Sequence, residues 1–191
     1  MIANCLIIPR RRALGYGIDT AKFPARRWGR TITWRGENKG RLQEALDIWQ
    51  GKLGISFQAT VADAADFALK WDGSAQSWHP GGSRPALGRP EAGKAGTLFL
   101  KSDAPLGIVL HEIGHLLGLS HEQDHPDNRD AYYRGQEAWI LEGVVTRGAL
   151  LAVYGPFDPL SVMLYPEATY ALMTKPSDGD VASAKAINGW V

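Results

Sequence analysis

The order of the expected strands and helices predicts an α/β (α+β) domain in which two helices back a mixed sheet. Residues 31–117 read as a strand, a helix, three strands and a second helix, and both helices have apolar residues on one face. The chain has 191 residues, of which 45% are hydrophobic, so it can bury one proper core. We therefore expect one domain, or one domain with two lobes across a cleft.

Local patterns place the elements of the first half of the chain. Apolar residues at i, i+3, i+4 and i+7 predict a helix with Asn38 as its N-cap. These apolar residues are Leu42, Ala45, Leu46 and Trp49. Short apolar runs predict strands at residues 31–34, 55–60, 67–71 and 97–100. The stretch over residues 72–96 is rich in Gly, Pro and Ser and is expected to be a long loop.

Further helices are expected towards the C-terminus. Residues 103–117 form the second helix of the predicted core, with Asp103 as its cap. Residues 136–142 have a weaker helical spacing of apolar side chains. Ser177 and Asp180 have the spacing of a capping box, which predicts a short last helix after them.

Three histidines in and just beyond the second helix have the spacing of a metal site. His111 and His115 are four residues apart, so a helix stacks both imidazoles on one face. Gly118 can adopt the left-handed conformation that ends a helix, and the resulting turn brings His121 back as a third ligand. A continued helix would carry His121 to the wrong face. Glu112 is turned round the helix and can reach water on the metal without binding the metal itself.

The clustering of histidines supports this interpretation. Four of the five histidines of the chain lie between positions 111 and 125. In a chain of this length and composition, five residues at these spacings arise by chance with a probability on the order of 10⁻⁵. Three neutral histidines leave a fourth position open for water, which indicates a catalytic rather than a structural zinc site. His79 and His125 are expected to be spare.

The run over residues 111–121 resembles the HExxHxxGxxH motif of the metzincin zinc metallopeptidases. Metzincins also carry a methionine turn, which residues 161–165 (Ser-Val-Met-Leu-Tyr, the methionine turn below) match. The sequence is most similar to the astacin family, in which a Glu follows the third histidine, as Glu122 does here, and the turn reads Ser-x-Met-x-Tyr. The serralysins, which share the Met-x-Tyr part of the turn, are the second resemblance.

This resemblance implies a two-lobed catalytic domain over residues 26–191. The upper lobe, residues 26–118, would contain the twisted sheet and two long helices above the cleft. The lower lobe, residues 119–191, would be mostly irregular with a C-terminal helix. Residues 1–25 would precede this domain as a pro-segment or an arm.

The resemblance also implies the roles of the residues at the metal. His111, His115 and His121 would bind one catalytic Zn²⁺. Tyr165 would bind the same ion at rest and swing away to donate a hydrogen bond to the oxyanion. The expected function is that of a zinc-dependent endopeptidase, in which metal-activated water attacks the peptide bond and Glu112 is the general base.

Supporting roles are expected for three further residues. Met163 would be a packed floor beneath the histidines, and Gly118 would supply the turn. Glu122 would either support the site from behind, for example by holding the side chain of His125 or Arg129, or lie on the surface.

Two residues of the N-terminal segment are candidates for latency. Cys5 is the only cysteine, so no disulfide can form within the chain. Its thiolate could cap the zinc in an inactive form, and the alternative is a cysteine without a role. Asp19 faintly resembles the aspartate that blocks the zinc in astacin precursors.

The composition of the chain limits the kinds of binding partner and the cellular location that we expect. The formal net charge is +1 and no apolar stretch is long enough to span a bilayer, so we expect no nucleic-acid and no membrane partner. No signal peptide is visible, because the short apolar run at residues 2–8 precedes the basic residues. A monomer that acts on a peptide or protein substrate, secreted or delivered outside the producing cell, is expected.

Two alternative functions stay open. The chain could be an effector or toxin protease that a cognate proteinaceous inhibitor controls. It could also be a catalytically silent module that binds peptides, although the presence of Glu112 argues against a loss of turnover.

Overall fold

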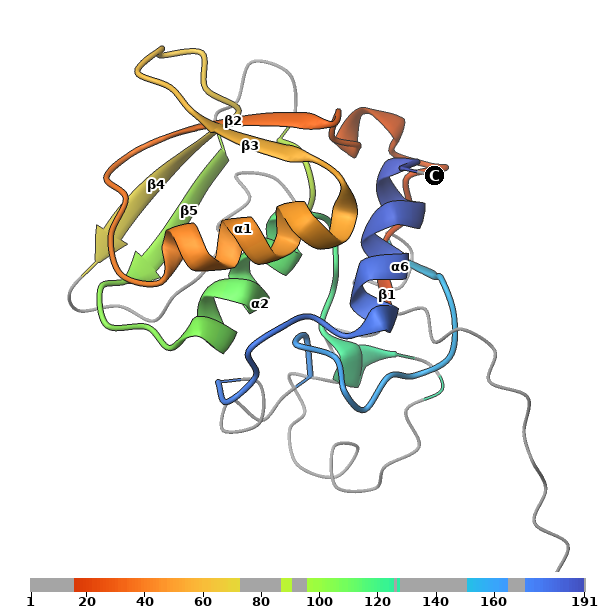
Figure 1. The fold of residues 1–191 in the computed structure, drawn as a ribbon. Coiled ribbons are helices and arrows are strands. Elements are labelled where there is room, and N and C mark those ends of the chain that lie inside the picture. Colours follow the sequence, from red (N-terminus) through yellow and green to blue (C-terminus); the bar gives the residue numbers. More distant parts are fainter. Residues whose placement is uncertain are drawn as a thin grey trace, which may run out of the picture.

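The computed structural model of the protein describes residues 16–72, 87–90, 96–125, 127, 151–164 and 171–190. In these ranges the main body consists of a four-stranded sheet, a two-stranded ribbon and three α-helices (Figure 1). The predicted α/β class is confirmed. The expected helix at 136–142, together with Cys5, His79 and Tyr165, lies outside the described residues.

The main sheet has the strand order β3-β2-β4-β5. Its strands are β2 (Thr31–Arg35), β3 (Ser56–Ala59), β4 (Phe67–Asp72) and β5 (Gly96–Lys101). Every neighbouring pair of these four strands is parallel, with Ile32 opposite Phe57 and Leu69 opposite Leu98. The four described strands thus form a parallel sheet rather than the expected mixed one, and the antiparallel pairing in the described chain occurs at a separate strand, β1 (Tyr16–Ile18). The four strands lie close to the predicted positions.

Helices α1 (Leu42–Leu53) and α2 (Leu106–Leu116) lie side by side beneath the sheet (Figure 1). The helical spacing predicted for α1 is confirmed, since its four apolar residues face the core and are fully buried. The indole N–H of Trp49 donates to the carbonyl of Leu110 over 3.2 Å, which ties α1 to α2. Helix α2 is therefore fixed by apolar packing against both the sheet and α1.

Both predicted N-caps of these helices are wrong. The turn at Gly40, with a φ of +55°, precedes α1, and the amide of Asn38 donates to the Gln43 side chain over 2.7 Å. Helix α2 begins only after Pro105, whose backbone is extended. Asp103 is exposed and pairs with Lys101 at 3.2 Å. In both cases a local turn delays the first helical residue beyond the reach of the expected cap.

The last helix, α6 (Asp178–Asn188), begins with the predicted capping box. The Ser177 hydroxyl accepts from the N–H of Asp180 and the Asp180 carboxylate accepts from the N–H of Ser177, both over 2.9 Å. The helix ends at Gly189, which has a φ of +69°. Its inner face contributes Ala184 and Ile187 to the common core.

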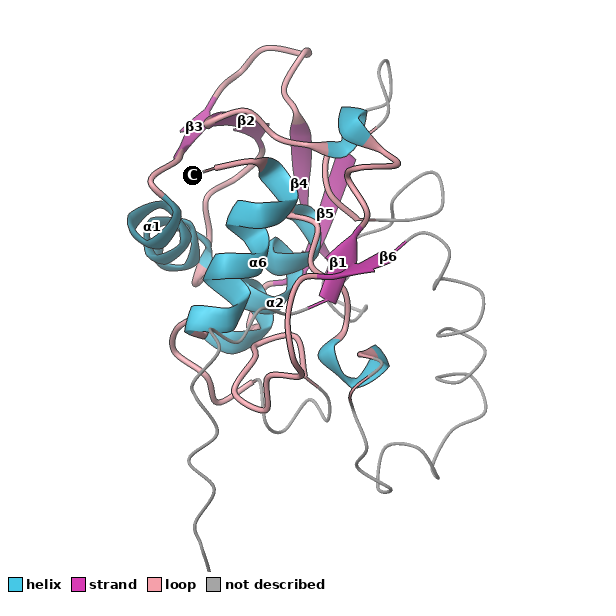
Figure 2. Cartoon of the chain, turned by 90° about the vertical axis from the view of Figure 1, so that its right-hand side faces the viewer, coloured by secondary structure: helices cyan, strands magenta, loops and turns pink. Residues whose placement is uncertain are grey.

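A short antiparallel ribbon joins the start of the described chain to its later part. Strand β1 (Tyr16–Ile18) pairs with β6 (Leu151–Val153), beside α6 in Figure 2. The other edge of β1 bonds the segment after α2, from the N–H of Ile18 to Gly118 (2.9 Å) and from the N–H of Ser120 to Tyr16 (2.8 Å). A 3-10 turn, η1 (Pro24–Arg26), follows. Residues 16–26 are thus built into the fold.

No helix among the described residues has the length and apolar character that a membrane crossing requires.

Candidate metal centre

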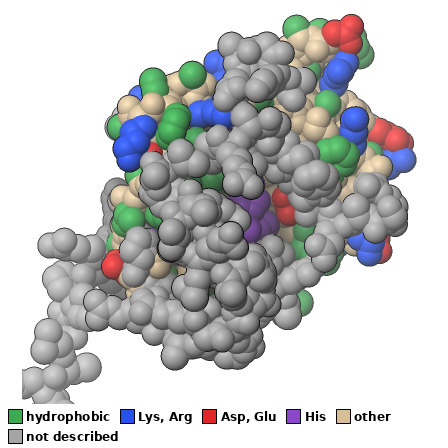
Figure 3. Space-filling view, turned by 180° about the vertical axis from the view of Figure 1, so that it is seen from behind, with side chains coloured by type: hydrophobic (Ala, Val, Ile, Leu, Met, Phe, Trp, Pro, Cys, Tyr) green, Lys and Arg blue, Asp and Glu red, His purple; other side chains and the backbone are tan. Residues whose placement is uncertain are grey.

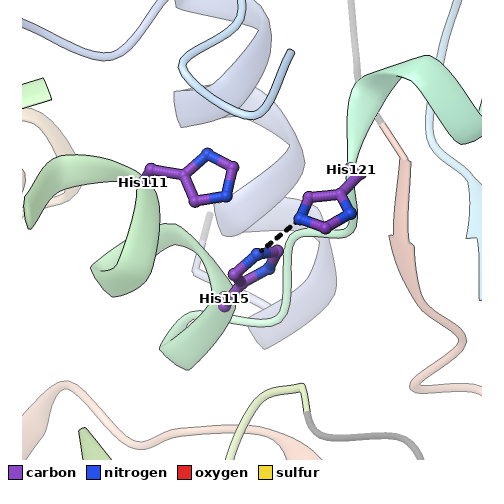
Figure 4. A group of neighbouring side chains, drawn as sticks. All are labelled: His111, His115 and His121. Atoms are coloured by element: carbon purple, nitrogen blue, oxygen red, sulfur yellow. Dashed lines mark hydrogen bonds between the residues drawn. The ribbon is translucent and has the colours of Figure 1, made fainter. Parts of the chain in front are cut away.

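The three predicted histidines converge on one point. His111 and His115 come from successive turns of α2, and His121 comes from the extended segment that enters η2 (Glu122–Asp124). One ring nitrogen of each histidine lies within 4.8 Å of the others. The Nε2 atoms of His115 and His121 are 3.0 Å apart and face each other (Figure 4). The spacing of the motif therefore produces a three-nitrogen cluster.

Backbone carbonyls fix the orientation of the two helical rings. The Nδ1 of His111 lies 2.7 Å from the carbonyl oxygen of Val162, and the Nδ1 of His115 lies 2.9 Å from that of Leu119. A carbonyl can only accept, so each Nδ1 carries the proton and donates it. Each Nε2 is then an acceptor directed at the cluster, as in metal sites where an outer hydrogen bond sets the tautomer.

Burial keeps the imidazole of His111 in the neutral form, which is the form that binds metal. The side chain of His111 is buried, and this burial lowers its pKa to about 4. His111 is therefore neutral near pH 7, as a metal ligand must be. His115 and His121 are only partly buried, and histidine side chains are visible on the face of the molecule shown in Figure 3. The cluster thus has a buried side and an open side.

Glu112 lies beside the first histidine with one oxygen unused. Its side chain is buried, and its Oε2 has no hydrogen-bond partner in the described part of the chain. Burial raises the pKa of Glu112 to about 8. A buried carboxylate oxygen without a partner is costly unless a cation or a water molecule meets it. Three converging ring nitrogens, with a buried carboxylate on the residue next to the first of them, fit a Zn²⁺ ion that carries water.

The turn that delivers His121 depends on Gly118. Its φ is +103°, and a Cβ there would lie 2.8 Å from the Cγ2 of Ile187 and 3.1 Å from that of Ile18. Both the backbone conformation and the space therefore require glycine.

Two residues that the sequence analysis did not single out complete the end of α2. The indole N–H of Trp28 donates to the carbonyl of Leu116 over 2.7 Å, and the amide of Asn188 donates to that of Leu117 over 2.9 Å. Helix ends leave such carbonyls unsatisfied unless other groups reach them. The partners lie far away in the sequence, and no local pattern indicates them.

The methionine turn packs against α2 next to the histidine cluster. Met163 is buried, and its sulfur packs against α2 at Gly114, where a Cβ would meet it. The carbonyl of Met163 accepts from the N–H of Glu122 over 2.9 Å. The structure thus places Met163 between α2 and the segment of His121. Tyr165 follows this part of the turn and lies outside the described residues, so its role stays a prediction.

Glu122 lies in the interior behind His121 rather than on the surface. Its carboxylate accepts from the N–H of Asp158 over 2.8 Å. Burial raises its pKa to about 8, against the effect of hydrogen bonds from the backbone of Asp158 and Tyr16. The expectation that it holds His125 is wrong, because the Nε2 of His125 donates to the carbonyl of Gly155 over 2.6 Å. Arg129 is outside the described residues.

Asp19 does not lie at the histidines, so the resemblance to a zinc-blocking aspartate is not supported. Its carboxylate accepts from the N–H of Ala21 over 3.1 Å and pairs with Lys22 at 3.0 Å. The hydrogen bond from the Lys22 side chain lowers the pKa of Asp19. Aspartate readily closes such a turn on its own backbone, and this local contact holds it away from the site.

The three histidines, the methionine turn beneath them and the parallel sheet with its two helices define the metzincin class of zinc-peptidase domains. Within this class the chain belongs to the astacin family of peptidases, because the model of the Astacin peptidase family matches residues 24–177.

Comparison with curated proteins gives distant relatives of the same kind. The chain is 26% identical to zinc metalloproteinase nas-36 of Brugia malayi over 138 residues, which are 69% of this chain and 22% of that protein. It is 42% identical over 66 residues to astacin-like metalloprotease toxin 2 of Loxosceles intermedia, covering 32% of this chain and 25% of the toxin. The chain thus spans about a fifth to a quarter of the length of these relatives.

Two solved structures share the fold. The structure of myroilysin aligns with a TM-score of 0.59 and 19% identity, covering 91% of this chain and 98% of that one. The hatching enzyme HCE-1, a zinc-protease from Oryzias latipes, aligns with a TM-score of 0.53 and 16% identity, covering 84% and 90% respectively. At these identities the likeness concerns the fold alone.

Proposed function

We propose that the protein is a zinc-dependent endopeptidase in which His111, His115 and His121 hold the ion and Glu112 is the general base. One observation carries the proposal: three histidine ring nitrogens converge on one point, and the residue after His111 is a buried glutamate whose Oε2 has no hydrogen-bond partner among the described residues. Membership of the astacin family supports it. A structural zinc site would instead have four protein ligands and no base beside them.

When bound, zinc supplies a Lewis acid that polarises the scissile carbonyl and lowers the pKa of water to about 7. The residues of the chain perform the proton transfers. Glu112 takes a proton from the attacking water as its oxygen bonds to the carbonyl carbon. Glu112 then gives this proton to the amide nitrogen as the carbon–nitrogen bond breaks. The products are a new carboxyl end and a new amino end.

The burial of Glu112 suits this role. A carboxylate whose pKa is raised by burial is a stronger base than an exposed one and still ionises near neutral pH. The metal charge opposes this increase in pKa, so the group can carry the proton for one step and release it in the next. We propose that Tyr165 donates a hydrogen bond to the oxyanion, as the family resemblance implies.

We further propose that the substrate is a peptide or protein and that the monomer acts outside the producing cell. The peptidase family supports the substrate class, and the name of the Loxosceles relative as a toxin is consistent with export. Control by a cognate proteinaceous inhibitor is the alternative setting for the same chemistry.

The experiment combines zinc analysis with digestion of an unfolded protein. Wild type should contain about one zinc per chain and cut the substrate, and a chelator should abolish cutting. Glu112→Ala should retain zinc and lose activity by a factor of at least about 10²–10⁴, the usual contribution of general acid–base catalysis. Wild type with full zinc and no cutting would instead indicate the silent peptide-binding module.

A matched pair of histidine variants tests the ligand set. His121→Gln should lose zinc, whereas His125→Gln should keep it, since glutamine can still donate to the carbonyl of Gly155. Loss of zinc in His125→Gln but not in His121→Gln would refute the assignment.

A further inference from the structure

The carboxylate of Asp180 connects α6 to the methionine turn. Its Oδ1 accepts from the Ser161 hydroxyl over 2.6 Å. Its Oδ2 accepts from the N–H of Val162 over 3.0 Å and from the N–H of Ser177 over 2.9 Å. Asp180 is buried, with 2% of its surface exposed. A helix cap needs only the bond to Ser177, so two of the three bonds serve another purpose.

The residue that Asp180 holds is the one that orients a metal ligand. The N–H of Val162 bonds to Asp180, and the carbonyl of Val162 accepts from the Nδ1 of His111 over 2.7 Å. With both polar groups of Val162 engaged, its backbone can hold only one orientation. The path from Asp180 to His111 therefore consists of two hydrogen bonds and one residue.

The same contacts also support the other side of the turn. The Ser161 hydroxyl, which donates to Asp180, accepts from the N–H of Met163 over 2.9 Å. The carbonyl of Met163 in turn accepts from the N–H of Glu122, the residue after His121. Asp180 is thus linked by hydrogen bonds to the backbone on both sides of the histidine cluster.

We propose that Asp180 is a positioning residue for the metal centre. It holds the methionine turn in place, and the turn in this position lets the carbonyl of Val162 orient His111. The inference rests on the proposed zinc site. It assigns α6 a part in metal binding, although α6 contributes no ligand from the described residues. Partners behind metal-binding histidines typically change metal affinity by about 10–100-fold when they are removed.

The test measures zinc affinity by competition with a chromophoric chelator for the full chain and its variants. Asp180→Ala, which removes all three bonds, should weaken zinc binding by about 10–100-fold. Asp180→Asn keeps one acceptor oxygen for the two N–H groups and should weaken it less. Asp178→Ala is the matched control, since Asp178 is exposed in the same first turn of α6 and carries the same charge.

A spectroscopic measurement separates positioning from mere stability. In the cobalt-substituted protein, the visible bands report the ligand geometry, so they should shift in the Asp180 variants and not in Asp178→Ala. If Asp180→Asn and Asp180→Ala lower only the melting temperature, with wild-type zinc affinity and cobalt bands, Asp180 is a helix cap and the proposal is wrong. If Asp180→Ala does not fold, Asp180→Asn decides by the same criteria.

These outcomes are distinct from a failure of the proposed function. Wild type that binds no zinc would refute the zinc site itself. Wild type that binds zinc but does not cut would refute the activity and leave the role of Asp180 open to the same measurement.

Discussion

The two helical histidines and the third histidine are placed by different forces. His111 and His115 stand on α2, which lies in the apolar core between the sheet and α1. His121 stands on an extended segment that β1 and the methionine turn hold through backbone hydrogen bonds, and the carboxylate of Glu122 in this segment accepts from the N–H of Asp158. Apolar packing tolerates many sequences, whereas the hydrogen-bonded side requires particular donors and acceptors. The comparison shows that one histidine cluster has two supports of different kinds, one apolar and one hydrogen-bonded.

The largest expected effect tests whether the apolar support is separable. Leu46 is fully buried in α1, and Leu46→Ala should lower the free energy of unfolding by about 2–5 kcal/mol. Urea unfolding of the zinc-free protein measures the loss. Zinc affinity, measured where the variant is still folded, should change by less than about twofold because no ligand or partner is touched. Zinc affinity that falls in step with stability would show that the core and the site are one unit.

The next effect comes from Glu112, the buried glutamate of α2. Burial raises the pKa of Glu112 to about 8, so the zinc-free folded protein binds this proton more tightly than the unfolded chain does. The folded state is therefore favoured at low pH, and this contribution is lost as pH rises from about 4.5 to about 8. Glu112→Gln should exceed wild type in zinc-free stability by on the order of 2–4 kcal/mol above about pH 8.

Denaturant unfolding at acidic and alkaline pH measures this difference, which should close near about pH 4.5. Glu44→Gln, which removes an exposed carboxylate from α1, is the control. A difference that is equal at both pH values would mean that the charge of Glu112 costs the fold nothing.

A smaller effect is expected at the turn between the two supports. Gly118→Ala forces a side chain into a φ of +103° and into contact with Ile187, which should cost about 1–3 kcal/mol and weaken zinc binding. The control is the same substitution at Gly51, an exposed position inside α1 with no atom near an added Cβ. Gly51→Ala should raise stability by about 0.5–1 kcal/mol. Thermal unfolding with and without zinc compares the two, and equal signs would contradict the geometry.

The apolar support could be predicted from the sequence because its rules are local. The spacing of Leu42 and Trp49 indicates α1, and the spacing of His111 and His115 indicates the helical half of the cluster. The capping box of Ser177 and Asp180 is equally local.

The polar support could not be predicted in the same way. The bond from Asn188 to Leu117 spans 71 positions and that from Asp158 to Glu122 spans 36, so no short pattern indicates them. The wrong cap at Asp103 has another cause, since a turn of the backbone outweighed the preference of the residue. The expected zinc-blocking role of Asp19 fails for a similar reason, because a local contact with Lys22 holds its carboxylate.

The meeting of Trp28 and Asn188 at the end of α2 has a consequence for biosynthesis. The N–H of Trp28 donates to the side chain of Asn188 across 160 positions, so closing this contact encloses most of the chain in one loop. On the ribosome, α2 and its paired imidazoles emerge long before Asn188 does. The terminal carbonyls of that helix wait for their donors until then, and such long-range closure is slow. A half-made polypeptide therefore lacks the two side-chain donors that complete the end of the helix carrying His111 and His115.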